Sequence, residues 1–215
     1  MHRSATLWII ILIAVTFAVS ACSSGSPPPN ADPPGEPEDI RSPKATVQFK
    51  GNRRLNNDLA RALGLPGERV CTELGRLPCT SQVHVITLGG VEPYRLGLQR
   101  PLAHTSATTP IAVDRVVMFA CRERADEDLA DPGNALIYAE LSITGGRLAV
   151  DEPSVANAID RLYKRGLLRP ATAAEVGHLR QLYRDIEATD SQAPARDWAV
   201  LACFAVMSSM EQLFY

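Results

Sequence analysis

The 215-residue sequence lacks the short motifs that mark several large functional classes. Cys-x-x-Cys-His is absent, so no covalent c-type haem can form in this chain. The glycine pairs at 89–90 and 145–146 fit neither Gly-x-Gly-x-x-Gly nor the P-loop pattern, and nothing else resembles a nucleotide site. The Gly-x-Ser-x-Gly elbow of many hydrolases is missing too.

Strong charge of either sign is also missing. The formal net charge is −2, and aromatic residues make up 6% of the chain. A charge this small and evenly mixed does not predict an anionic partner. Because no basic stripe with interleaved aromatic residues occurs, we expect no nucleic-acid binding.

The chain begins with the layout of a secretory signal peptide. Arg3 precedes an apolar run at residues 7–15, and small residues follow. The sequence Val19-Ser20-Ala21-Cys22 resembles the bacterial lipoprotein lipobox. This resemblance implies removal of residues 1–21, a diacylglycerol thioether on Cys22 and acylation, for example with palmitate, of the new amino terminus. Ordinary signal cleavage near Ala21 is the alternative.

Residues 22–46 are dense in Pro, Gly, Ser and acidic side chains and have almost nothing apolar to bury. Such a composition predicts a disordered tether between lipid and domain. Two or more acyl chains give stable anchoring, so we expect a lipid-anchored protein of the cell envelope, facing the periplasm or the cell surface. Ser23 after the lipidated cysteine favours the outer membrane by analogy with well-studied bacteria.

Residues 47–215 are long enough to form one domain. The predicted fold is mostly α, an irregular helical bundle with a long loop region between residues 79 and 110. We divide it into a cysteine-containing half, 47–145, and a three-helix half, 151–215. In the first half, helices are predicted at 54–63, 68–74, 110–129 and 134–143.

Side-chain chemistry fixes further details. Thr109 is predicted to cap the 110–129 helix, with Ile111 facing inward and Arg124 and Asp128 on a solvated face. A helix should begin near Pro153, and Thr172 with Glu175 forms a capping box before the next helix. Residues 198–207 are apolar nearly all round, which predicts the buried centre of the bundle.

Four cysteines follow Cys22, an even set typical of an oxidising compartment. They allow three pairings, of which we favour Cys71–Cys79 and Cys121–Cys203; a buried free thiol at Cys203 is the alternative. Three of them could instead join His84 in a tetrahedral zinc site, formed by Cys71, Cys79, His84 and Cys121. We favour disulfides, because an exported chain oxidises its cysteines before it binds metal, and predict no cofactor.

The last third resembles a small helical domain of unknown function. The similar features are Arg161-Leu162-Tyr163, the segment from Leu168 to Val176, and Ser209 before Leu213-Phe214-Tyr215. That domain occurs in large exported proteins of planctomycetes and myxobacteria that also carry c-type cytochrome modules. The resemblance implies export and association with cytochrome-linked proteins, and it supplies no catalytic residues.

The loop from residue 88 to residue 95 is the best candidate for binding. Its glycines and proline predict an ordered loop that presents an aromatic and an arginine to a protein partner. A packed structural loop is the alternative reading. The candidate binding residues are Gly89, Gly90, Glu92, Tyr94 and Arg95.

The sequence therefore predicts a membrane-anchored, exported binding or accessory module for a protein partner, and not an enzyme by itself. The alternative is a metal- or redox-associated accessory protein of a c-type cytochrome system. Hydrolysis based on His104 and its neighbouring hydroxyls is a remote third option, because no acid is placed to orient that imidazole.

Overall fold

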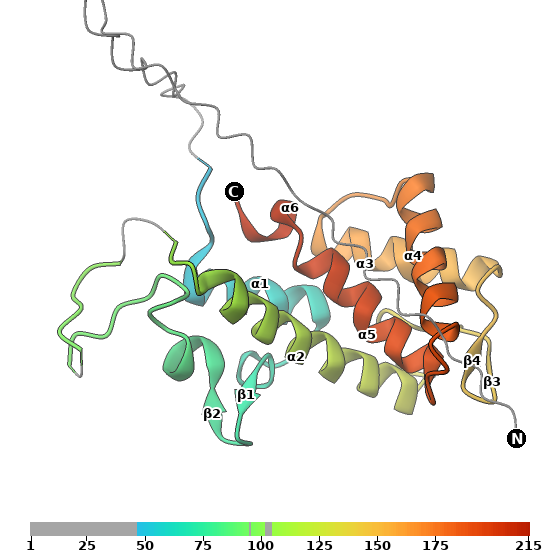
Figure 1. Ribbon diagram of the computed structural model, residues 1–215, viewed down its shortest axis with the longest axis horizontal. Coiled ribbons are helices and arrows are strands. Elements are labelled where there is room, and N and C mark those ends of the chain that lie inside the picture. The colour runs from blue at the N-terminus through green and yellow to red at the C-terminus, as the bar shows by residue number, and fades with distance from the viewer. Residues whose placement is uncertain (1–46, 95, 102–104) are drawn as a thin grey trace, which may run out of the picture. The chain divides into compact units, whose positions relative to one another are not determined.

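The computed structural model describes residues 47–94, 96–101 and 105–215 (Figure 1). The signal peptide, the tether with Cys22, and residues Arg95 and His104 lie outside this part. The described residues form a mostly helical domain, as predicted. None of their helices is both long enough and apolar enough to cross a membrane.

Six α-helices and several short elements make up the domain. The α-helices are α1 (Gly51–Leu63), α2 (Thr109–Ala130), α3 (Pro153–Gly166), α4 (Ala173–Glu187), α5 (Pro194–Met207) and α6 (Met210–Leu213). The short elements are η1 (Gly67–Arg69), the antiparallel pair β1 (Thr72–Glu73) and β2 (Leu77–Pro78), the π-helical η2 (Cys79–Val83), and the antiparallel pair β3 (Ile143–Thr144) and β4 (Arg147–Leu148).

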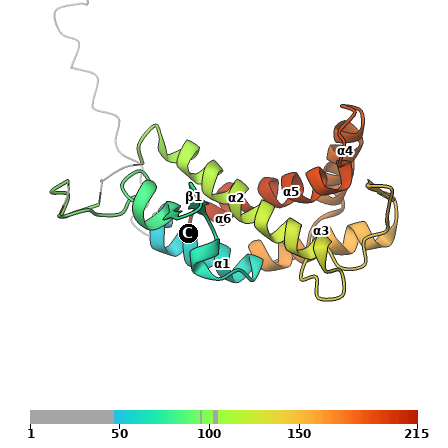
Figure 2. The ribbon, with the colours of Figure 1, turned by 90° about the horizontal axis from the view of Figure 1, so that it is seen from below.

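Helix α5 is the buried centre, which confirms the prediction from its composition. Trp198, Ala202 and Cys203 are fully buried, and the Trp198 indole donates to the Leu179 carbonyl of α4 at 2.8 Å. Helices α2 and α5 form one layer, α1 and α3 lie beneath them, and α4 stands at one end (Figure 2). A single apolar core runs through these helices.

Both favoured disulfides are confirmed. Cys71 and Cys79 join the two ends of the β1–β2 hairpin, with their Cα atoms 5.4 Å apart. Cys121 and Cys203 join α2 to α5, with their Cα atoms 5.6 Å apart. The predicted helix at 68–74 is wrong. The hairpin closed by the Cys71–Cys79 disulfide occupies this part of the chain instead, and it turns at Leu74 and Gly75, whose φ angles are positive, 51° and 69°.

Helix α2 spans nearly the predicted length, but three details differ. Thr109 lies inside the helix, and its hydroxyl donates to the Thr87 carbonyl at 2.6 Å, so it does not act as the cap. Ile111 is 61% exposed, although we predicted an inward position. Arg124 is buried, although we predicted a solvated one. Periodicity within α2 missed these positions because contacts with other parts of the chain decide them: Thr109 bonds to the loop at Thr87, and Arg124 packs against the end of α1.

Asp128 explains why the helix predicted at 134–143 does not form. Its carboxylate is buried and accepts hydrogen bonds from the backbone N–H groups of Leu136, Ile137 and Tyr138, at 2.8–3.0 Å. The chain therefore wraps around this carboxylate, and the predicted helix at 134–143 does not form; turns and bends occupy the segment instead. A buried charge that meets three backbone donors dictates the local conformation more strongly than helix propensity does.

The same carboxylate holds Arg124 against the end of α1. The Arg124 guanidinium lies 2.7 Å from Asp128 and donates to the Leu63 carbonyl at 3.3 Å. Arg165 of α3 donates to the neighbouring Ala62 carbonyl at 2.6 Å. Two arginines thus satisfy carbonyl groups that the end of α1 leaves unpaired. This network ties α1, α2 and α3 together.

The predicted capping box is confirmed and is part of a larger ionic cluster. Thr172 and Glu175 exchange the expected hydrogen bonds. Arg169 donates to Glu175 at 2.7 and 3.0 Å and to Glu211 of α6 at 2.9 and 3.0 Å. Arg169 and then the Thr172 backbone N–H lower the pKa of Glu175 to about 2. The cluster fastens the α3–α4 turn to the C-terminal segment.

Replacing Asp128 should destabilise the domain strongly. The Asp128→Ala variant leaves three backbone donors and the Arg124 cation short of a partner in the core. We expect the free energy of unfolding to fall by about 3–5 kcal/mol. Urea denaturation of the oxidised protein measures this, with Asp151→Ala as the control: its exposed carboxylate should be worth no more than about 1 kcal/mol. Equal losses for both variants would contradict this role.

The ionic cluster should make stability depend on acid pH through Glu175. Its folded-state pKa, about 2, lies below its ordinary value, so its contribution is present above about pH 4.3 and is lost as the pH falls toward 2. Glu175→Gln keeps a capping-box residue but removes the charge. We expect its melting temperature to fall less between pH 5 and pH 2 than that of the wild type, whereas Glu68→Gln should match the wild type. Parallel curves for all three proteins would be evidence against the cluster.

Candidate functional site

The predicted binding loop has a packed base. Gly89 has a φ angle of +74°, and the Gly90 N–H donates to the Val85 carbonyl at 2.7 Å. A Cβ atom at Gly90 would lie 2.7 Å from that carbonyl oxygen and 2.9 Å from the Asn52 side chain. The glycines therefore serve close packing against α1, which favours the structural reading for this part of the loop.

Beyond the glycines the chain forms a projection that we call the arm, residues 91–101. Glu92 and Leu98 exchange two backbone hydrogen bonds at 3.0 and 3.1 Å, which closes the arm at its base. At its tip Tyr94 is 96% exposed and Leu96 is 62% exposed. The arm extends away from the helices (green, left side of Figure 1). Its described side chains thus include an aromatic and an aliphatic group that the domain does not cover.

A polar groove lies between α1 and the base of the arm, with a volume of about 670 Å³. Asn52 and Asn56 of α1 line it, but both are engaged. The Asn52 amide donates to the Thr80 carbonyl at 3.0 Å, and Asn56 accepts from the Thr80 hydroxyl at 2.9 Å. These side chains hold η2 against α1, so their first role is structural.

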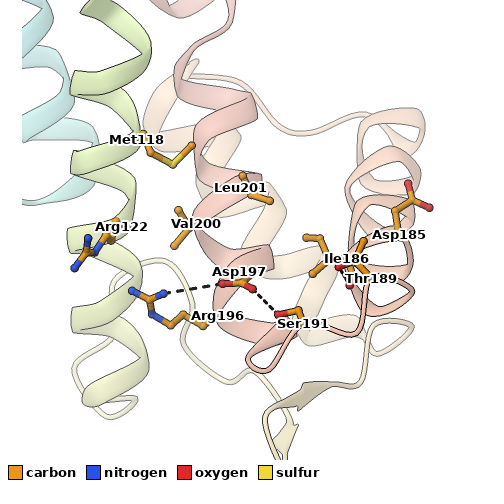
Figure 3. Close-up of a pocket in the computed structure, with 10 residues that line it drawn as sticks. All are labelled: Met118, Arg122, Asp185, Ile186, Thr189, Ser191, Arg196, Asp197, Val200 and Leu201. Atoms are coloured by element: carbon orange, nitrogen blue, oxygen red, sulfur yellow. Dashed lines mark hydrogen bonds and ion pairs between the residues drawn. The ribbon is translucent and has the colours of Figure 1, made fainter.

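A second hollow, which sequence reasoning missed, lies between α2, α5 and the end of α4 (Figure 3). We call it the trough, and its volume is about 490 Å³. Apolar side chains from three helices line it, and charged or hydroxyl groups surround them. The apolar residues are Met118, Ile186, Val200 and Leu201, and the polar ones are Arg122, Asp185, Thr189, Ser191, Arg196 and Asp197.

Charges on the rim of the trough differ in how firmly they are held. Arg196 binds Asp126 with two hydrogen bonds at 2.7 and 2.9 Å, which raise the pKa of the Arg196 guanidinium. The Ser191 hydroxyl donates to Asp197 at 2.5 Å. The Arg122 guanidinium is 3.6 Å from the Asp126 carboxylate, which is already hydrogen-bonded to Arg196. The Arg122 side chain is 66% exposed. Arg122 is therefore the cation most available to a ligand.

The trough continues into a neighbouring hollow of about 560 Å³, with which it shares Met118 and Arg122. The neighbouring hollow is lined by Phe119 and Phe204 and reaches Leu74 at the β1–β2 turn. Together the two hollows follow the seam between α2 and α5. The composition of α5 was the feature of the sequence that could have indicated these hollows. A helix that is apolar on nearly every side exposes apolar side chains wherever the neighbouring helices do not cover it.

The proposed zinc ligands do not form a metal site in the structure. Cys71, Cys79 and Cys121 are disulfide-bonded, and the His84 ring hydrogen-bonds to Glu73 at 2.8 Å. Among the described residues, no group of three or more His, Cys, Asp or Glu side chains could hold a metal ion. Glu73 also pairs with Arg115 at 3.3 Å, so the imidazole is part of a half-buried polar cluster.

No protein-family model, curated protein or solved structure matches the chain. The resemblance of residues 151–215 to the helical domain of cytochrome-linked proteins therefore stays a prediction. Among the described residues, two surfaces combine exposed apolar groups with neighbouring polar ones, the trough and the tip of the arm.

Proposed function

We propose that this protein is an exported lipoprotein, anchored through Cys22, that serves as a binding module for a protein partner at the bacterial outer membrane. The lipobox-like segment and the predicted tether support the anchor. The two disulfides are consistent with an oxidising compartment, where such bonds form and persist. The module is an accessory protein in this proposal, and any chemistry belongs to its partner.

The observation that carries the proposal is the trough. Its floor is apolar, its three walls belong to helices fixed by core packing, and its rim carries charges of both signs. Arg122 stands on the α2 side and Asp185 on the α4 side (Figure 3). An amphipathic helix fits such a surface, with its apolar stripe on Val200 and Leu201 and its flanking charges opposite those of the rim.

The partner belongs to the class of exported proteins, since it must meet the trough outside the cytoplasm. The resemblance of residues 151–215 adds cytochrome-linked proteins as candidates. In that version the module would help to hold a cytochrome-bearing protein at the membrane, and haem would lie in the partner. This replaces the redox alternative that used Cys71, Cys79, His84 and Cys121, because those cysteines form disulfides.

Site-specific photo-crosslinking in the lipidated, full-length chain tests the proposal. A photoreactive residue at Arg122 or Asp185 should yield one defined adduct in the cell envelope. The same residue at Arg147 or Lys164, which are exposed on other elements, should yield none. Adducts of equal yield from all four positions would show that the trough is not the docking surface.

Substitutions then separate binding from folding. Leu201→Asp places a charge on the half-buried floor, and Arg122→Glu reverses an exposed cation with little risk to the fold. We expect each to lower the yield of the Asp185 adduct about tenfold, equivalent to about 1.4 kcal/mol of binding. Leu168→Asp, at an exposed leucine outside the trough, is the control and should leave the yield unchanged. Full yield with both trough variants would refute the proposal.

A further inference from the structure

The arm and the start of the described chain lie at the same end of the domain. Residues 47–50 pair with the C-terminal segment: Gln48 and Tyr215 exchange two backbone hydrogen bonds at 3.1 Å. Helix α1 begins immediately afterwards at Gly51. A Cβ atom placed on Gly51 would lie 3.7 Å from the Leu88 carbonyl oxygen, and one on Gly89 would lie 4.0 Å from the Cα atom of Gly51. The base of the arm therefore adjoins the point where the chain enters the domain.

This position is also where the predicted tether enters the domain. With the lipid on Cys22, residues 22–46 join it to the domain. A fully extended chain of about 25 residues reaches at most roughly 80–90 Å. The arm starts beside the end of that chain and projects outward (Figures 1 and 2). The trough, in contrast, is lined by the middle of α2, by α5 and by the end of α4, and by no residue of the arm.

The tip has the chemistry of a group that contacts the interface of a bilayer. Tyrosine has an apolar ring and a polar hydroxyl, and it is enriched at the level of lipid headgroups. Tyr94 and Leu96 are highly exposed, and Val91 at the start of the arm is 39% exposed. None of these side chains lines the trough. Tyr94 and Leu96 also line none of the other hollows described above.

We propose that the tip of the arm, through Tyr94 and Leu96, inserts into the interface of the bilayer that holds the lipid anchor. The inference rests on the lipid anchor of the proposed function. It assigns the predicted binding loop to the membrane and not to the protein partner. A weak contact suffices here, because the anchor keeps the tip at high effective concentration near the surface. The contact would restrict the orientation of the domain on the bilayer.

Fluorescence on anchored protein tests the insertion. Cys22 of the mature chain is the only cysteine outside the two disulfides, so it can be coupled to a maleimide lipid in vesicles of phosphatidylethanolamine and phosphatidylglycerol. In the Tyr94→Trp variant, emission should shift to the blue on coupling, and brominated lipids should quench it. Leu168→Trp is the matched control at an exposed leucine outside the arm and should show neither effect. Trp198 is fully buried and contributes equal background to both.

Adding Leu96→Ser to the Tyr94→Trp variant should reduce the quenching by brominated lipids at least threefold, because half of the apolar tip is lost. Unchanged emission on coupling, or quenching equal to that of Leu168→Trp, would overturn the inference. Chemical coupling supplies the anchor, so the outcome does not depend on lipidation in the cell. Failure of the proposed function would appear separately, as a mature protein without lipid or without an adduct at the trough.

Discussion

The structure depends on the burial of α5. A helix that is apolar on nearly every side cannot face water, so three helices must pack around it, and the fully buried Trp198 marks its centre. The Cys121–Cys203 disulfide fixes the longest helix, α2, against it. This arrangement also explains the trough. Where α2 and the end of α4 leave a space over α5, Val200 and Leu201 remain as an apolar floor.

Polar groups decide the parts of the fold that apolar packing does not. Asp128 gathers three backbone N–H groups and the Arg124 cation inside the core, and so shapes the connection between α2 and β3. Arg169 joins the α3–α4 turn to α6 from outside. Together with the disulfides, these contacts make a rigid domain. A rigid domain can present the trough to a partner and the arm to a bilayer as separate surfaces.

Local signals in the sequence predicted much of the helical half. These signals act within a few residues of one another, so the sequence alone is enough to recognise them. They are Pro153, the Thr172 and Glu175 capping box and the apolar 198–207 segment. Asp128 could not be read in this way, because its partners lie outside its own helix and its burial depends on tertiary packing. The trough was missed for the same reason. Loop composition located the arm, but only the structure placed its base beside the entry of the chain.

The central claim is an exported, disulfide-bonded domain held by a lipid on Cys22, and intact mass with thiol alkylation tests it most directly. The protein would be isolated from bacterial membranes and measured before and after reduction. We predict a chain that begins at Cys22 with its lipid, takes up no alkylating groups when oxidised and takes up four after reduction. A chain that retains residues 1–21, or one that carries free thiols and no lipid, would contradict the account.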